Sequence, residues 1–267
     1  TVCSNVPPPL LGGVLPAAGV VVAGAAPAPT TIPAAGVTAG CGAAPGPGRA
    51  GSPVADSLVE ARRADGRTEQ FQQFYDDSAT PGPRFVWHRS QEEPGGEYGA
   101  WERVSETPVG PKLYQVSAVE NGRGGLEVFI ASYGSICRTV LATPDGRWSA
   151  AEGFELAPPP YHGGITLFKE RDGRLHAFAA GNGSSGAMEV RSQRDGSGDA
   201  WGPVRPLPGL PEPGRGLSAP SSVVQLADGR LQVTAREWNA DRYWRTSEAD
   251  RFGSWVPWRL CADGTCG

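Results

Sequence analysis

The stretch Leu226–Thr234 (LADGRLQVT) decides the fold, because versions of it occur four times along the chain. The other copies lie at residues 169–178 (KERDGRLHAF), 119–129 (VENGRGGLEVF) and 61–71 (ARRADGRTEQF). Each copy places Asp-Gly or Asn-Gly between two runs of alternating residues. This arrangement is a strong β-hairpin signal, and the two-residue type I′ turn that it predicts needs a positive φ at both central residues.

Two markers recur at the same spacing. The Asp or Asn of the turn stands at positions 65, 121, 172 and 228, in steps of 56, 51 and 56 residues. A tryptophan trails each copy, at Trp101, Trp148, Trp201 and Trp255, in steps of 47, 53 and 54. Each repeat resolves into four short strands, which is typical of a β-propeller blade. We therefore expect an all-β propeller of four four-stranded blades, or five if residues 20–23 add a strand, with the tryptophans packed between blades.

Composition divides the chain into three expected parts. The 38 glycines and 26 prolines among 267 residues disfavour long helices. We expect an extended Pro/Ala/Gly-rich N-terminal segment (1–54), a propeller (55–260) and a Cys-bounded C-terminal tail (261–267). The net charge of −4 gives no extended basic surface, so we expect no nucleic-acid partner.

The first 48 residues contain nine prolines and no charged side chain. Prolines and glycines exclude a helix, and the interrupted apolar run is too short to span a membrane. An extended, polyproline-like ribbon is the conformation that remains. The ribbon is either a linker or stalk, a ligand for the groove of a partner, or a strap that packs against its own propeller.

The five cysteines favour an oxidising, extracellular compartment. Cys261 and Cys266 are close enough in sequence for a local disulfide. Cys3 and Cys41, in the N-terminal segment, are further disulfide candidates, whereas Cys137 fits a buried small hydrophobe. A chain that starts at Thr1 without a leader is either a mature exported protein or a trimmed one, and secretion is the expectation that we adopt.

The sequence offers little catalytic machinery. Residues 192–201 and 143–148 resemble the Asp-box turns of sialidases, but a sialidase also needs a tyrosine nucleophile and usually six blades. The three histidines have no serine or cysteine at a triad spacing, and we interpret His176 as a satisfied structural residue. The adjacent acidic pairs at 76–77 and 92–93 are interpreted as solvated loop charge. We therefore expect a chain that is not an enzyme and that needs no cofactor or metal.

The pattern DGRLxxF followed by a tryptophan about 25 residues later resembles the propeller lectins of the tachylectin and Photorhabdus-lectin kind. The resemblance covers residues 55–260 and implies sugar sites between blades, against aromatic and polar side chains. The sugar-binding residues that it implies here are Trp87, Trp238, Tyr243 and Trp244. Three of these lie in the fourth repeat, and the other repeats lack a matching cluster, although a repeat lectin should repeat its site.

A propeller preceded by a long uncharged ribbon also resembles the adaptor subunit of umbrella toxin particles. This resemblance implies a secreted, non-catalytic adaptor that links a toxin scaffold to a spoke subunit carrying lectin and trypsin-like domains. It implies that residues 1–33 thread into a cleft of the spoke, where an extended backbone binds by strand addition. The expected partner-binding residues are Val2, Val6, Pro7, Pro8, Pro9, Leu10, Leu11, Val14, Leu15 and Pro16. The adaptor is our first hypothesis, a propeller lectin the second and a sialidase-like glycosidase the third.

Overall fold

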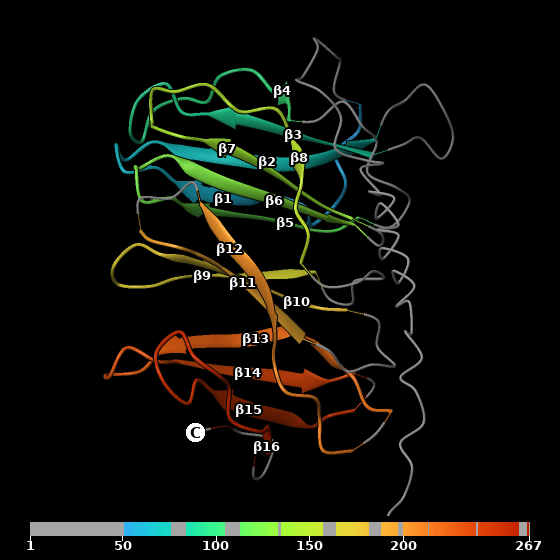
Figure 1. Cartoon of the computed structure of the whole chain (residues 1–267). Helices are drawn as coiled ribbons and strands as arrows, with labels where there is room; N and C mark the ends of the chain where they lie inside the picture. The colour runs from blue at the N-terminus through green and yellow to red at the C-terminus, as the bar shows by residue number, and fades with distance from the viewer. Residues whose placement is uncertain are drawn as a thin grey trace, which may run out of the picture. The chain divides into compact units, whose positions relative to one another are not determined.

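A computed structural model describes residues 51–75, 84–104, 113–132, 135–156, 164–181, 188–196, 200–212, 214–238, 240–261 and 266 (Figure 1). The chain divides into two units, Thr1–Gly36 and Val37–Gly267, and every described residue belongs to the second. The expected N-terminal ribbon and its partner-binding residues therefore lie outside the described residues. Within the described part of the chain, no helix has the length and apolarity needed to cross a membrane.

The described chain is all β and forms four antiparallel sheets of four strands, as predicted (Figure 1). The first sheet contains β1 (Val59–Arg62), β2 (Thr68–Tyr75), β3 (Arg84–Ser90) and β4 (Glu102–Arg103). The second contains β5 (Leu113–Glu120), β6 (Leu126–Ser132), β7 (Ile136–Leu141) and β8 (Glu152–Gly153). The third contains β9 (Ile165–Lys169), β10 (Leu175–Ala180), β11 (Met188–Gln193) and β12 (Trp201–Pro206). The fourth contains β13 (Leu217–Gln225), β14 (Leu231–Glu237), β15 (Tyr243–Ser247) and β16 (Arg259–Leu260).

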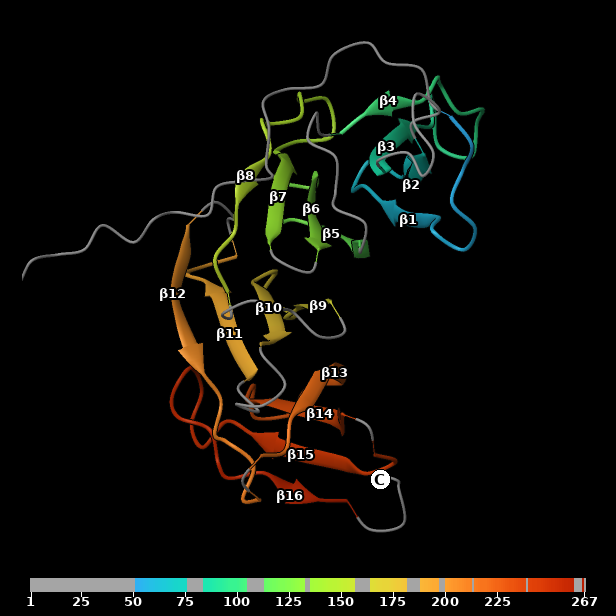
Figure 2. The ribbon, with the colours of Figure 1, turned by 90° about the vertical axis from the view of Figure 1, so that its right-hand side faces the viewer.

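Within each sheet the strands pair in sequence order, which is the meander of a propeller blade. Extensive strand packing joins consecutive blades: β1 lies against β5, β5 against β9, and both β9 and β10 against β13 (Figure 2). The expected propeller of four blades is confirmed.

The hairpin turns differ from the predicted type I′ geometry. Gly66, Gly173 and Gly229 have φ between 88° and 90°, but the aspartates before them do not have a positive φ. In the first blade the Gly66 amide donates to Arg63 O and the Arg63 amide donates to Arg67 O. These bonds define a three-residue loop with a left-handed glycine at its end, a common alternative to the two-residue turn. The aspartate carboxylate accepts the amide proton two residues later, as Asp228 does from Arg230.

The second repeat aligns two residues away from its expected position. Here the Gly124 amide donates to Asn121 O, and Gly124 carries the positive φ of 81°. Asn121 therefore corresponds to Arg63 of the first repeat, not to the turn aspartate. Its side chain accepts the amide protons of Arg123 and Gly125 and donates to Leu141 O. The two extra glycines of this repeat lengthen the sequence between the Asn-Gly pair and the following strand.

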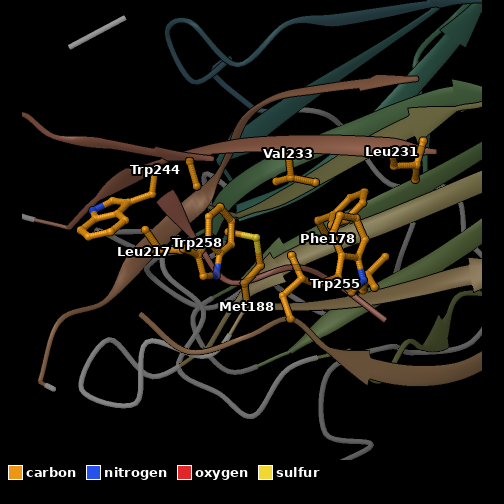
Figure 3. Close-up of a cluster of buried hydrophobic side chains, with 11 residues drawn as sticks. Phe178, Met188, Leu217, Leu231, Val233, Trp244, Trp255 and Trp258 are labelled. Carbon is orange, nitrogen blue, oxygen red and sulfur yellow. The ribbon is translucent and has the colours of Figure 1, made fainter. Parts of the chain in front are cut away.

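Aromatic contacts between successive blades explain the repeated tryptophans. A buried phenylalanine on the second strand of one blade meets the tryptophan of the next blade edge to face. The pairs are Phe71–Trp148 at 5.8 Å, Phe129–Trp201 at 5.8 Å and Phe178–Trp255 at 6.2 Å between ring centroids. Figure 3 shows the last pair within the apolar cluster between the third and fourth blades. The expected packing is thus confirmed for three of the four tryptophans.

The series of aromatic pairs ends at the fourth blade. Thr234 occupies the position that Phe178 holds in the third blade, and it is only half-buried. Trp101 instead contacts Phe74 of its own blade, at 5.1 Å. At this position the fourth blade thus presents a polar side chain where the first three blades present an aromatic ring.

The disulfides confirm one expectation and correct another. Cys261 and Cys266 are bonded to each other, as predicted. Cys137 on β7 is buried, as expected, but it is also disulfide-bonded. The interpretation of Cys137 as a simple apolar side chain is therefore wrong. Cys3 and Cys41 lie outside the described residues.

Replacing Phe129 by alanine should lower the free energy of unfolding by about 3–5 kcal/mol, because the ring is fully buried in a seam between blades. Thr234→Ala, at the corresponding position of the fourth blade, should cost less than about 1 kcal/mol. Urea unfolding followed by tryptophan fluorescence measures both changes. Equal losses for the two variants would show that the aromatic pairs do not hold the blades together.

Candidate functional site

The meander gives each blade two different edges. The turns after its first and third strands lie at one edge, called here the Asp-Gly edge. The turn after its second strand and the connections to neighbouring blades lie at the opposite edge. At the opposite edge of the fourth blade lie the connection from the third blade, at 207–216, and the turn between β14 and β15, at 238–242. The structure describes both except for residues 213 and 239.

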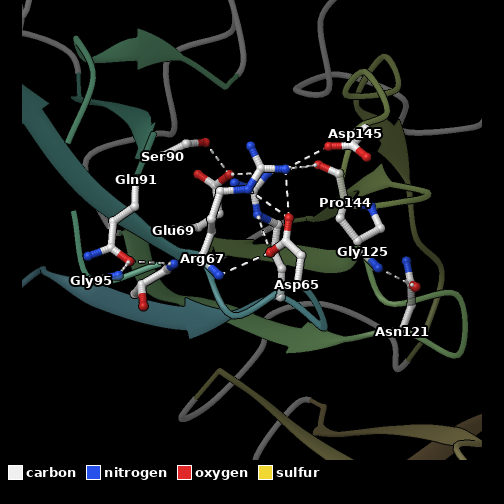
Figure 4. Close-up of polar contacts among 12 residues, drawn as sticks. Asp65, Arg67, Glu69, Ser90, Gln91, Gly95, Asn121, Gly125, Pro144 and Asp145 are labelled. Carbon is white, nitrogen blue, oxygen red and sulfur yellow. Dashed lines mark hydrogen bonds and ion pairs between the residues drawn. The ribbon is translucent and has the colours of Figure 1, made fainter. Parts of the chain in front are cut away.

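At the Asp-Gly edge, charged side chains join the first two blades (Figure 4). The guanidinium groups of Arg63 and Arg67 both donate to Pro144 O, at 3.0 and 3.2 Å. Arg67 Nη2 also lies 2.8 Å from Asp145 Oδ1, and Arg67 Nε donates to Asp65 Oδ2 at 2.7 Å. These bonds connect the hairpin of one blade to that of the next, so this edge stabilises the fold.

A pocket of 380 Å³ opens at the same edge of the first blade, lined by Arg62, Gly66, Thr68, Gln91, Pro94 and Gly95. Gln91 Oε1 accepts the amide protons of Thr68 and Gly95, at 3.0 and 3.3 Å. Its Nε2 donates to Gly96 O at 3.1 Å, so this side chain ties two turns together. Arg62 is the one charged residue in the lining, which gives the pocket little basis for selecting a ligand.

The structure brings His176 between a serine and a glutamate. His176 Nδ1 lies 2.8 Å from Ser192 Oγ, and its Nε2 lies 2.7 Å from Glu170 Oε1. The sequence did not indicate this trio, because Ser192 becomes the cross-strand partner of His176 only through the pairing of β10 with β11. The imidazole is fully buried, and Arg251 and Gln225 of the fourth blade hold the same glutamate. The trio therefore fastens two blades together, and no substrate can reach the ring.

The other acidic and histidine candidates do not form an open site. His88 Nδ1 lies 3.3 Å from the buried Glu69 carboxylate, and its ring packs against Trp148. Glu92 and Glu93 are exposed on a turn, as expected. His162 and the pair at 76–77 lie outside the described residues. Among the residues that the structure describes, no group of three or more His, Cys, Asp or Glu side chains could hold a metal ion.

A charged cluster lies at the opposite edge of the fourth blade, and we call it the arginine clamp. It consists of Glu212, Arg215, Glu237 and Arg242. Arg215 donates through Nη1 to Glu237 Oε1 at 2.6 Å, and its Nε lies 2.9 Å from Glu212 Oε2. Arg242 Nη2 lies 2.7 Å from Glu237 Oε2 and 3.2 Å from Glu212 Oε2. The clamp thus holds two carboxylates between two guanidinium groups, with formal charges that sum to zero.

Trp238 stands beside the clamp with 45% of its surface exposed. Its amide donates to Gly216 O at 2.8 Å, so its backbone lies against the segment that carries Arg215. The turn is closed by the Glu237 amide, which donates to Arg242 O at 2.8 Å. The backbone of Trp238 is thereby fixed next to the two segments that carry the arginines of the clamp, and its side chain is partly exposed.

The expected sugar-binding aromatic residues are not equally accessible. Tyr243 and Trp244 follow Trp238 on β15, so the fourth blade does bring three of the four together. Trp244 and Trp87 are each only 3% exposed, so neither ring offers a face to a ligand. Trp87 lies in the first blade, where the Arg103 guanidinium sits 5.4 Å from its ring. The sequence reading missed the clamp, because its members come from two segments 22 or more residues apart and follow no motif.

The clamp fixes the charge of its buried carboxylate. Burial alone would raise the pKa of Glu237. Hydrogen bonds from Arg242, Arg215 and Trp244 outweigh burial and lower the pKa from 4.5 to about 2. Glu237 therefore stays ionised at physiological pH and is poorly suited to act as a general acid.

Comparison with known proteins identifies the fold. No protein-family model matches the chain, and no curated protein matches it. A protein of unknown function from Dyadobacter fermentans DSM 18053 shares the fold with a TM-score of 0.55 and 9% identity, over 83% of this chain and 72% of that one. An α-L-arabinanase of Penicillium chrysogenum complexed with arabinobiose has a TM-score of 0.49 and 16% identity, over 85% of this chain and 73% of that one. A GH43 β-1,3-galactosidase has a TM-score of 0.45 and 13% identity, over 80% of this chain and 48% of that one.

These comparisons correct the expectation that the chain is not an enzyme. Most of the solved structures named among its neighbours are glycoside hydrolases, including an α-L-arabinofuranosidase of Podospora anserina and an exo-β-1,3-galactanase of Phanerochaete chrysosporium. Their identities to this chain are 11–16%, so the likeness concerns the fold.

The pH dependence of stability should reveal the ionised Glu237. Because the pKa of Glu237 in the folded protein lies below 4.5, the ionised side chain adds to the free energy of unfolding at neutral pH. This contribution disappears as the pH falls from about 4.5 to about 2. Glu237→Gln should therefore destabilise the protein at pH 7 by on the order of 2 kcal/mol and much less near pH 2. Chemical unfolding across this range measures the difference, and Glu93→Gln on an exposed turn is the control. A gap between wild type and Glu237→Gln that stays constant with pH would contradict the assignment.

Proposed function

We propose that the protein binds carbohydrate at the opposite edge of the fourth blade, on the surface formed by Trp238 and the arginine clamp. The observation that carries this proposal is a partly exposed tryptophan whose backbone is fixed beside the two segments that carry the arginines of the clamp. A sugar ring has an apolar C–H face that packs on an aromatic ring, and hydroxyl groups at its rim that need hydrogen-bond partners. Arginine and glutamate supply planar pairs of donors and acceptors for such hydroxyl groups.

The rigidity of the surface supports the same proposal. Glu237 is buried and held by Arg215, Arg242 and the indole Nε1 of Trp244, which donates at 3.1 Å. The arginines are therefore positioned before any ligand arrives, which reduces the entropy lost on binding. Binding groups placed in this way at the end of a propeller blade fit a small, partly exposed ligand such as an oligosaccharide.

Trp238→Ala should weaken glycan binding at least about 10-fold, because the aromatic face for the sugar is lost. Phe252→Ala is the matched control, since Phe252 is 38% exposed in the same blade but lies on a turn at the Asp-Gly edge. A glycan array with the labelled full chain identifies ligands, and calorimetry on the best ligand compares the variants. Chromatography of the bound glycan after incubation shows whether it is also cleaved.

An array without any glycan signal would remove the proposed function. Equal affinities of wild type and Trp238→Ala for a glycan that does bind would place the site elsewhere on the molecule.

A second candidate function is the assembly of a larger secreted complex through the N-terminal segment. Its support is the sequence of residues 1–48, which have no charge and nine prolines, together with the architectural resemblance to umbrella toxin adaptors. Three disulfide-bonded cysteines, Cys137, Cys261 and Cys266, are consistent with an oxidising compartment. In this role the segment would bind a lectin-bearing, trypsin-like spoke subunit, and the propeller would dock on the toxin scaffold. The role is compatible with glycan binding because it uses another part of the chain.

Deleting residues 1–33 should abolish co-purification with larger secreted proteins and leave the propeller folded. The physical reason is that an extended apolar segment binds a cleft through its backbone and its Val, Leu and Pro side chains. Pull-down from culture supernatant with full-length and shortened protein measures the effect, and circular dichroism checks folding. Recovery of the same proteins by both forms would show that the segment is not the binding element.

A further inference from the structure

The arginine clamp holds two carboxylates that differ in environment. Glu237 is 2% exposed, ends strand β14 and receives an additional hydrogen bond from Trp244. The Glu212 side chain is 44% exposed and belongs to the connection between the third and fourth blades. Glu237 is thus part of the framework of the blade, whereas Glu212 reaches the clamp from a surface segment.

Glu212 occupies the position of an anion between the two arginines. Its Oε2 lies 2.9 Å from Arg215 Nε and 3.2 Å from Arg242 Nη2, so one oxygen contacts both guanidinium groups. The same two side chains bind Glu237 through Nη1 and Nη2, at 2.6 and 2.7 Å. Two guanidinium groups need two negative charges for balance, and the buried glutamate provides one of them. The second anion position is filled from the chain itself.

We propose that Glu212 stands in for the carboxylate of an acidic sugar, and that a uronic-acid-type ligand displaces it from Arg215 and Arg242 while its ring packs on Trp238. This inference rests on the proposed glycan-binding function and names the class of glycan. The exchange of one carboxylate for another keeps the cluster neutral, so no buried charge is left unpaired. Carboxylates are the ligands that the planar fork of arginine binds best.

Displacing Glu212 from the two arginines costs free energy, so Glu212 lowers the apparent affinity of the site for an acidic sugar. A carboxylate held on a short tether competes at an effective concentration in the millimolar range. If Glu212 occupies the clamp about 90% of the time, removing its charge should tighten the binding of an acidic sugar about 10-fold. The neutral form of the same sugar should gain nothing, because it brings no charge to the vacated position.

The test uses the full chain with two probes of identical backbone, trigalacturonic acid and its fully methyl-esterified form. Calorimetry is performed on wild type, Glu212→Gln and the control Glu93→Gln. We expect Glu212→Gln to bind the acid about 10-fold more tightly than wild type does, to bind the ester no better, and to lose the gain when combined with Trp238→Ala. Thermal unfolding of each variant confirms that the blade remains folded.

Three results would overturn this inference. Unchanged affinity of Glu212→Gln for the acid would show that Glu212 does not compete. An equal gain for acid and ester would show that the substitution merely opens the surface. A gain that survives Trp238→Ala would show anion binding without a sugar ring on the indole. Failure of the proposed function looks different, because then neither probe nor any arrayed glycan binds to any variant.

Discussion

The edge-to-face contact between a phenylalanine and the tryptophan of the next blade is the interaction on which the rest of the structure depends. It recurs at three seams, and each time the phenylalanine is fully buried. A four-stranded sheet with apolar side chains on both faces cannot be stable alone, so each blade needs a neighbour. The aromatic pair supplies this neighbour contact at the same place in each of the three seams, which accounts for the regular spacing of these rings in the sequence.

Polar side chains complete the same seams. The second residue of the strand after each of the first three turns is buried and polar: Glu69, Glu127 and His176. Each is tied to a neighbouring strand or blade, as when Gln193 Nε2 donates to Glu127 Oε1 at 2.6 Å. Hydrogen bonds of this kind add specificity to an apolar seam, because a shifted register would leave buried charges without partners. The charged groups at the Asp-Gly edge thus serve the fold, while in the arginine clamp at the opposite edge Arg215, Arg242 and Glu212 are partly exposed around the buried Glu237.

The sequence predicted the architecture well because the architecture is repetitive. Alternating residues indicate strands, glycines indicate turns and the tryptophans indicate packing between blades, and four copies of each pattern made the prediction clear. The exact turn could not be predicted, since Asp-Gly suits both a two-residue and a three-residue loop. The shift of Asn121 by two residues accompanies the two extra glycines of its repeat. The clamp and the His176 trio were not predictable, because they form where distant segments meet. Burial also decides between tryptophans that look alike in sequence: Trp238 is accessible, and Trp87 and Trp244 are not.

The threonine at position 234 has a consequence for how this chain can evolve. A repeat protein lengthens by duplicating one unit, and the tryptophan of each new unit needs an aromatic side chain of the preceding blade to pack against. The first three blades offer a buried phenylalanine at this position, but the fourth has a small hydroxylated side chain that is only half-buried. A duplicated unit added after the last blade would have no aromatic partner at this seam. One side chain therefore removes the main apolar contact that a further unit would need at this seam.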